Sequence, residues 1–459
     1  NNYGDMNLYG TITNSSADKL TSIVNAGGQQ NIGNVKIETA YDLEVKNTGS
    51  GIMNVYSGDI TSGNDANFIN SGENHGILFD NVARVTAEND VNVTNDSKGD
   101  VLVKGIIKSV QQDVSVSSLG GSIVIGDKDK DEFDDAHIQA GRDVNLATTN
   151  AHILNAGVNK TLITAGRDFN ATATNGKIGE NEHFCEGGMC VGVEAETARD
   201  LTKSINVDVQ GLVTAETTRT SGSQNHLVNI ASKDSDLNIN HIHAAGDVLL
   251  LAGETADKQA SILNGQVVEE GEDPVANIIG NRISLIASNN IGSNDAALTF
   301  DQGTFYNMNQ NLFHDDPDAL AEQPGMDVLA INDIYIKGFS DNYDTNVCKM
   351  ISREGNINAE FSGNTYIDEI TAAGDINIVT RGREMTINKL GTVTFDNETN
   401  SDWYGPNANN IAPNDDIIYK QVSPDIPIIL FNKGIIEGKN DFVKLLLLLL
   451  SSFLYKSNK

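Results

Sequence analysis

The chain has 459 residues, with 31 Lys and Arg against 63 Asp and Glu, which gives a formal charge of −32 at pH 7. This charge argues against nucleic acid as a partner, because the phosphates would be repelled. Forty-three glycines, seven prolines, one tryptophan and three cysteines exclude a disulfide-scaffolded fold and indicate short strands around a core of small aliphatic side chains.

Residues 1–126 contain short segments in which apolar and polar residues alternate after Gly, Asn or Asp. Pairs such as Val91 and Val93 lie two residues apart, so both side chains point to one face of a strand. We expect these segments to be the first coils of a solenoid, with the paired residues inside. The chain begins at Asn1 and shows no signal peptide, so we interpret it as an internal piece of a longer protein.

Residues 127–137 form the densest charge cluster and are expected to leave the solenoid as an acidic loop. Asp127, Asp129 and Asp131 alternate as the first ligands of a calcium loop do, since a hard cation prefers several carboxylate oxygens around one point. The pattern then fails, because the sixth position is not Gly and the twelfth is not Glu. The sequence favours a solvated loop, with a calcium site as the alternative.

The clearest repeats lie between residues 138 and 395, where the word AGRD begins at Ala140 and again, 25 residues later, at Ala165. Self-similarity at this period is typical of a solenoid, in which each unit buries its apolar face only by stacking on its neighbours. Insertions interrupt the repeats near 254–273 and 300–326. The residues expected to face inward after the two copies are Val144, Leu146, Thr148, Phe169, Ala171 and Ala173.

An aspartate precedes the first inward residue of several repeats, and these positions are Asp143, Asp168, Asp247 and Asp375. Stacked in neighbouring coils, their like charges would repel each other. We therefore expect these carboxylates to fan outward or to be offset.

Cys185 and Cys190 flank a Gly-Gly turn and are close enough in sequence for a small disulfide staple in an oxidising compartment. Two free thiols in a loop are the alternative. A zinc site with His183 is disfavoured, because no fourth ligand lies nearby. His241 and His243 share one strand face, where surface or ladder histidines are favoured over a metal site.

Residues 396–459 contain four of the seven prolines, so continuous strand pairing should stop there and leave an irregular segment. The apolar run Leu445 to Leu450 is too short to span a bilayer. Upstream, the coil lengths of 17 to 25 residues predict an all-β parallel β-helix, in which each coil pairs with the next at about 4.8 Å.

The AGRDVNL and AGDVLLL units, with their ILNAG and NNIG companions, resemble the filamentous-haemagglutinin-like large surface proteins of Gram-negative bacteria, best over residues 138–395. The resemblance implies a right-handed parallel β-helix and type V export through an outer-membrane transporter. It also implies an extracellular or cell-surface location and adhesion to a host-cell or bacterial receptor or glycan. We expect a non-catalytic shaft segment that folds by stacking of coils rather than around a cofactor.

Two other functions stay open. A β-helical polysaccharide-degrading enzyme needs a carboxylate cluster with a basic partner, for which the adjacent aspartates 134–135, 315–316 and 415–416 are the candidates. A glycan-binding trimer similar to a phage tail spike needs an apolar outer face, whereas the outward positions are mostly Asn, Thr, Ser and Asp.

Overall fold

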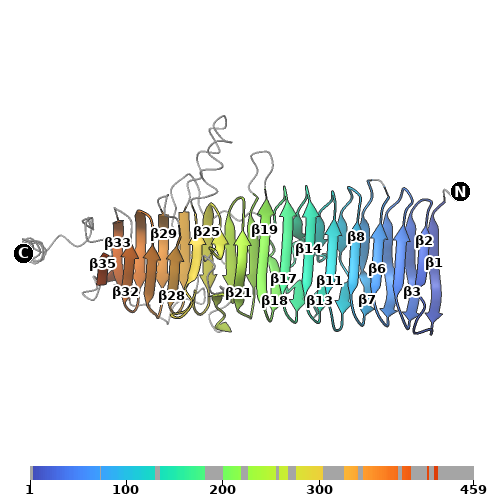
Figure 1. The fold of residues 1–459 in the computed structure, drawn as a ribbon, viewed down its shortest axis with the longest axis horizontal. Helices are drawn as coiled ribbons and strands as arrows, with labels where there is room; N and C mark the ends of the chain where they lie inside the picture. Colours follow the sequence, from blue (N-terminus) through green and yellow to red (C-terminus); the bar gives the residue numbers. More distant parts are fainter. Residues whose placement is uncertain are drawn as a thin grey trace, which may run out of the picture.

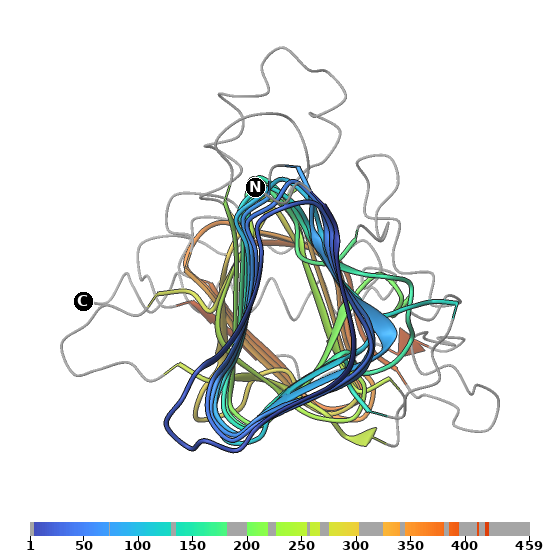
Figure 2. The ribbon, with the colours of Figure 1, turned by 90° about the vertical axis from the view of Figure 1, so that its right-hand side faces the viewer.

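Short strands stack into a parallel β-helix, as the sequence predicts. Figure 1 shows the rod in a computed structural model, and Figure 2 shows its three-sided cross-section. The strands belong to two long sheets of 19 and 16 strands. The structure describes residues 4–72, 74–129, 135–180, 200–218, 226–254, 258–266, 275–302, 325–339, 345–380, 385–393, 411–412 and 418–421.

The 19-stranded sheet covers two sides of the rod in the first coils, where a long strand bends at an irregularity in its register. Its strands are β1 (Met6–Asn14), β3 (Gln30–Thr39), β5 (Met53–Ser62), β7 (Ile77–Ala87), β9 (Val101–Val103), β10 (Ile106–Ser109), β12 (Ile123–Ile125), β13 (Ile138–Ala140), β15 (Ile153–Asn155), β16 (Ile163–Ala165), β18 (Ile205–Val209), β20 (Val228–Ser232), β22 (Val248–Ala252), β25 (Arg282–Ala287), β27 (Gly325–Ala330), β29 (Thr345–Ser352), β31 (Thr365–Ala372), β33 (Met385–Val393) and β34 (Ile411–Ala412).

The 16-stranded sheet forms the remaining side. Its strands are β2 (Thr21–Asn25), β4 (Leu43–Asn47), β6 (Ala66–Asn70), β8 (Val91–Asn95), β11 (Val114–Ser118), β14 (Val144–Thr149), β17 (Phe169–Thr174), β19 (Leu212–Thr218), β21 (Leu237–His243), β23 (Ile262–Asn264), β24 (Ile278–Ile279), β26 (Leu298–Asp301), β28 (Ile334–Gly338), β30 (Ile357–Phe361), β32 (Ile376–Thr380) and β35 (Ile418–Gln421). Val144 pairs with Phe169 in the parallel register, so the 25-residue sequence period is one coil.

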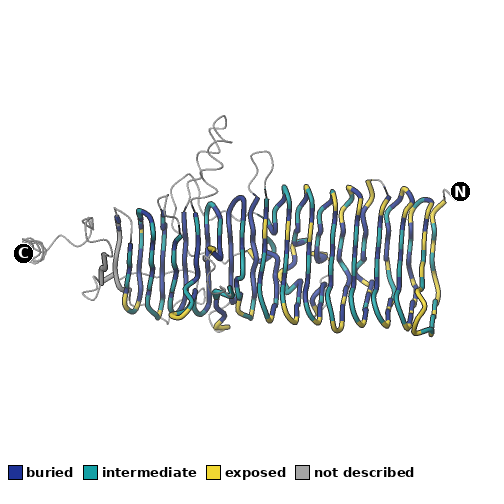
Figure 3. The backbone as a smooth tube through the Cα atoms, in the orientation of Figure 1, coloured by how far each residue is buried: buried dark blue, intermediate teal, exposed yellow. Residues whose placement is uncertain are grey.

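Aliphatic side chains two residues apart fill a single interior that runs along the rod. Figure 3 shows buried residues, in dark blue, recurring in coil after coil. Val144 and Phe169 are fully buried and Leu146 is 2% exposed, which confirms the predicted inward face. Aromatic rings from successive rungs also pack on each other inside, with the Phe68 and Phe79 centroids 5.2 Å apart at an edge-to-face angle of 78°.

One corner of the rod, after β2, β4 and β6, is built from stacked asparagines and glycines. The Asn47 amide donates to Asn70 Oδ1 at 3.2 Å, and the Asn70 amide donates to Asn95 Oδ1 at 2.9 Å. A Cβ atom on Gly49 would lie 1.9 Å from the Gly27 carbonyl oxygen. Glycine is therefore required here, because the backbones of neighbouring coils touch.

The outer face of the 19-stranded sheet carries a second apolar cluster from β20 to β29, joined by Leu201 from the segment before β18. This differs from the expectation of mostly polar outward residues. The continuous apolar run of β22 is typical of a strand that is buried on both faces, and all five of its residues are buried. The cluster consists of Leu201, Ala231, Leu251, Ile286, Leu329, Ile331 and Ile351.

Most of the predicted irregular segment 396–459 lies outside the described residues, including the run Leu445 to Leu450. Within it, β34 pairs antiparallel with β33, and β35 adds a parallel rung next to β32. Residues 303–324 of the predicted insertion near 300–326 lie outside the described residues. In the insertion predicted near 254–273, residues 258–266 are described, and β23 pairs with β21 as part of the 16-stranded sheet. In the part of the chain that the structure describes, no helix is long and apolar enough to cross a membrane.

Candidate functional site

Aspartates that precede strands of the 16-stranded sheet form a ladder along a second corner of the rod. Asp143 and Asp168 are stacked in it, so for these two the expectation that they fan outward or are offset is wrong. Asp247 instead precedes β22 of the other sheet, and the N–H of Asp375 bonds Asn356. The Oδ1 atom of Asp65 accepts the backbone N–H of Asp90 at 3.2 Å, and Asp90 Oδ1 accepts the N–H of Asp113 at 3.1 Å. The ladder continues through Asp143 and Asp168. Each carboxylate stays stacked because the next coil supplies a donor to it.

Arginines of the AGRD words neutralise part of this ladder. Arg142 donates to both carboxylate oxygens of Asp113, at 2.7 Å from Nε and 2.5 Å from Nη2. Arg167 holds Asp143 in the same two-bonded way. Because both arginines reach back to the preceding coil, the like charges of the stacked carboxylates are compensated between coils.

The pKa values of two ladder carboxyls shift in opposite directions because only one of them has an arginine beside it. The hydrogen bond from Arg142 lowers the pKa of Asp113. Burial raises the pKa of Asp65, and the neighbouring carboxylates of Asp90 and Asp42 add to this effect. The Asp ladder thus stabilises the stack between residues 113 and 168. Its hydrogen bonds and ion pairs hold neighbouring coils together, which is a structural role.

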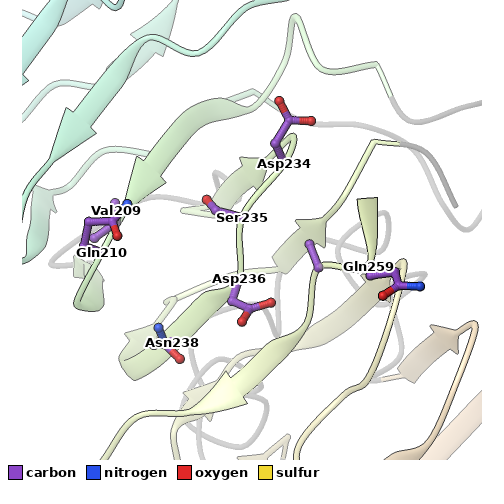
Figure 4. A pocket seen from close by; sticks show the side chains of 8 residues that line it. Val209, Gln210, Asp234, Ser235, Asp236, Asn238 and Gln259 are labelled. Carbon is purple, nitrogen blue, oxygen red and sulfur yellow. The ribbon is translucent and has the colours of Figure 1, made fainter. Parts of the chain in front are cut away.

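A polar hollow of about 370 Å³ opens beside this corner, where the connection between two strands becomes longer from coil to coil. Only Gln210 and Gly211 join β18 to β19, whereas four residues join β20 to β21. Figure 4 shows the side chains around the hollow. They belong to Val209, Gln210, Asp234, Ser235, Asp236, Asn238, Gln259 and Ala260.

Both carboxylates of the polar hollow already have partners. Asp234 forms an ion pair with Lys258 at 2.9 Å, and Asp236 Oδ1 accepts the backbone N–H of Ser261 at 2.7 Å. Figure 4 shows the two carboxylates apart, with Ser235 between them. They do not converge on one point, as a pair of acid and base carboxyls in a glycosidase would.

The amides of the polar hollow are its available hydrogen-bonding groups. The side chains of Gln210, Asn238 and Gln259 form no hydrogen bond with the described residues, and an amide offers both donors and an acceptor. This arrangement suits a small polar ligand.

The predicted calcium ligands are only partly described. The Asp127 carboxylate accepts the N–H of Asp129 at 3.2 Å and lies 3.6 Å from Lys104 Nζ, while Asp131 lies outside the described residues. Across the described ranges, no group of three His, Cys, Asp or Glu side chains is placed to hold a metal ion. The calcium site with Asp131 therefore stays a prediction.

Cys185 and Cys190, with His183, lie outside the described residues, so the staple stays a prediction. The third cysteine, Cys348 on β29, is disulfide-bonded.

His241 and His243 lie side by side on β21, with their ring centroids 3.1 Å apart. Burial lowers the pKa of His243 to about 4, and the neighbouring imidazole of His241 contributes to the shift. His243 is thus neutral at pH 7.

Of the six candidate catalytic aspartates, the structure describes only Asp135. Asp135 is exposed, whereas the other five, at positions 134, 315, 316, 415 and 416, lie outside the described residues. The enzyme hypothesis stays untested at those positions.

An exposed aromatic pair on the first coils has no counterpart among the sequence predictions. Tyr9 and Tyr56 are 65% and 43% exposed and lie against the same glycine, Gly33. The recurring words NLYG and NVYSG, two coils apart, are the signal that would have found the pair.

No family model, curated protein or solved structure matches this chain.

Proposed function

We propose that the chain is a non-catalytic shaft segment of a secreted or cell-surface bacterial adhesin, which mediates attachment to host cells or other surfaces. The observation that carries this proposal is the continuous stack of coils, held at one corner by the Asp ladder and filled by a single apolar interior. Such a rod displays surface side chains at the strand spacing of about 4.8 Å over its whole length.

The way in which the stack is stabilised supports export followed by folding outside the cell. The AGRD contacts and the apolar interior involve only neighbouring coils, so each coil can form on the one before it. The formal charge of −32 keeps an extended chain soluble. An exported chain that passes an outer-membrane transporter unfolded needs both properties.

The test is an attachment assay with the full chain. Beads coated with the chain are applied under flow to cultured epithelial cells and to bacterial layers, beside albumin-coated beads. We expect retention several-fold above albumin, and loss of that gain in the variant Leu146→Asp, which places a charge in the interior. Retention equal to albumin on every surface would rule the proposal out.

A further inference from the structure

Tyr9, Gly33 and Tyr56 form a patch on the outer face of the first coils, here called the tyrosine patch. The two side chains are 65% and 43% exposed, whereas Gly33 between them is buried. A Cβ atom on Gly33 would lie 3.7 Å from Tyr9 Cε1 and 4.0 Å from Tyr56 Cδ2. The two rings therefore reach over the glycine from the two neighbouring coils, and both are open to solvent.

The register of the coils builds this patch. Leu8 pairs with Ile32, and Ile32 pairs with Val55, all on successive rungs. The next residue of each strand is Tyr9, Gly33 or Tyr56. Glycine at the middle position leaves room for the rings of both neighbouring coils, and Figure 3 shows that exposed residues are frequent at this end of the rod.

Amide and hydroxyl groups flank the tyrosine patch on both sides. On one side, the Asn31 amide donates to Asn7 Oδ1 and the Asn54 amide donates to Asn31 Oδ1, both at 2.9 Å. On the other side, Ser57 Oγ accepts the N–H of Asn34 at 2.8 Å and donates to its Oδ1 at 3.3 Å. These hydrogen bonds order the flanking amides. Asn54 is buried, whereas Asn7, Asn31 and Asn34 are accessible to a ligand.

An exposed aromatic surface flanked by ordered amides matches the chemistry of a sugar. A pyranose ring has an apolar face of C–H groups that packs on an aromatic ring, and hydroxyls around its edge that bond amides. The formal charge of −32 repels sulfated and other acidic polysaccharides. The ligand that fits these features is a neutral glycan.

We propose that the tyrosine patch binds a neutral glycan, with the sugar rings packed on Tyr9 and Tyr56 and their hydroxyls bonded to the flanking asparagines. This inference rests on the proposed attachment function and names the ligand class and the residues for it. The patch lies on the surface of the rod, so binding does not require the stack to open.

The test is affinity electrophoresis of the full chain in gels that contain a β-1,4-glucan, a galactan or an N-acetylglucosamine polymer, beside a sulfated polysaccharide. We expect at least one neutral polymer to retard the chain and the sulfated polymer to have no effect. The double variant Tyr9→Ala/Tyr56→Ala should weaken the retardation at least tenfold, while Tyr9→Phe/Tyr56→Phe keeps most of it. Leu119→Ala is the matched control, because Leu119 is 59% exposed and lies on a later coil.

Two outcomes would overturn the inference: no retardation by any neutral polymer, or equal retardation of the wild type and the double alanine variant. Neither outcome affects the attachment proposal if the coated beads are still retained on cells. If the beads are not retained but the gel shift is lost with the alanine variant, the glycan site stands and the attachment proposal fails. Melting curves of both double variants check that the stack is intact.

Discussion

Arg167 holds Asp143 of the preceding coil, with 2.7 Å between Nε and Oδ1, while the same Oδ1 accepts the backbone N–H of Asp168 at 3.2 Å. The AGRD motif therefore makes contacts with both neighbouring coils. Its arginine donates to the aspartate of the preceding coil, and its aspartate accepts a backbone N–H from the following coil. Parallel Arg–carboxylate hydrogen bonds are directional, so this contact also fixes the register of neighbouring coils.

The ladder predicts different costs for two substitutions at Asp143. Asp143→Ala leaves the partly buried N–H of Asp168 without its acceptor, which should cost about 2 kcal/mol of unfolding free energy. Asp143→Asn keeps an oxygen in the same place and should cost clearly less. Urea unfolding measures both, and equal losses for the two variants would show that the hydrogen bond to the next coil does not matter.

Two carboxylates of the ladder should respond to acid in opposite ways. The pKa of Asp113 is lowered from 3.8, so the stabilisation from its Arg142 contact is complete above pH 3.8 and is lost as the pH falls through the folded-state pKa. The pKa of Asp65 is raised from 3.8, so its ionisation weakens the fold as the pH rises from 3.8 through the folded-state pKa.

Hydrogen exchange of strands β6 and β11 measures this difference, after correction for the intrinsic exchange rate at each pH. Between pH 5 and pH 3, β6 should gain protection relative to β11. A parallel change in both strands would contradict the assignment of the two pKa directions.

His243 predicts a separate loss of stability in mild acid. Its pKa falls from 6.5 to about 4 on folding, so the unfolded chain binds more protons between these values. The contribution of His243 to stability is complete above pH 6.5 and disappears as the pH falls to 4. Thermal melts across this range should show a smaller decline for His243→Gln, and an identical decline would exclude the imidazole as its source.

Inward and outward positions of one strand should differ sharply in their tolerance of charge. Leu146→Asp places a carboxylate in the interior, where an unpaired charge costs several kcal/mol, and the neighbouring coils should unfold. Asn145→Asp, one residue earlier on β14, faces outward and should leave the melt within a few degrees of the parent. Limited proteolysis compares the two variants, and equal resistance would refute the assigned faces.

Two glycines offer a steric comparison. A Cβ on Gly49 would lie 1.9 Å from the Gly27 carbonyl oxygen, whereas on Gly33 the nearest atoms are 3.7 Å away. Gly49→Ala should therefore force neighbouring coils apart and lower the melting temperature markedly, while Gly33→Ala should be tolerated. Differential scanning calorimetry measures the melting temperatures of both variants. An unchanged melting temperature for Gly49→Ala would mean that the corner can accommodate a Cβ atom.

The period and the inward face were predictable from the sequence because both are local. An extended strand places every second side chain on one face, so Val144, Leu146 and Phe169 could be assigned to the interior without knowing which coil lies above which. The repeated AGRD words gave the coil length directly, and Val144 indeed pairs with Phe169.

The contacts between coils could be identified only from the tertiary structure. Whether Asp143 meets an arginine or another carboxylate depends on the residue that the stacking brings beside it, and the connections between coils vary in length. The same holds for the outer cluster around Leu251 and for the rings that close over Gly33. The sequence by itself determined which side chains each coil buries, because strand geometry is local. Only the stacking of the coils decided which side chains of neighbouring coils meet and which of them face solvent together.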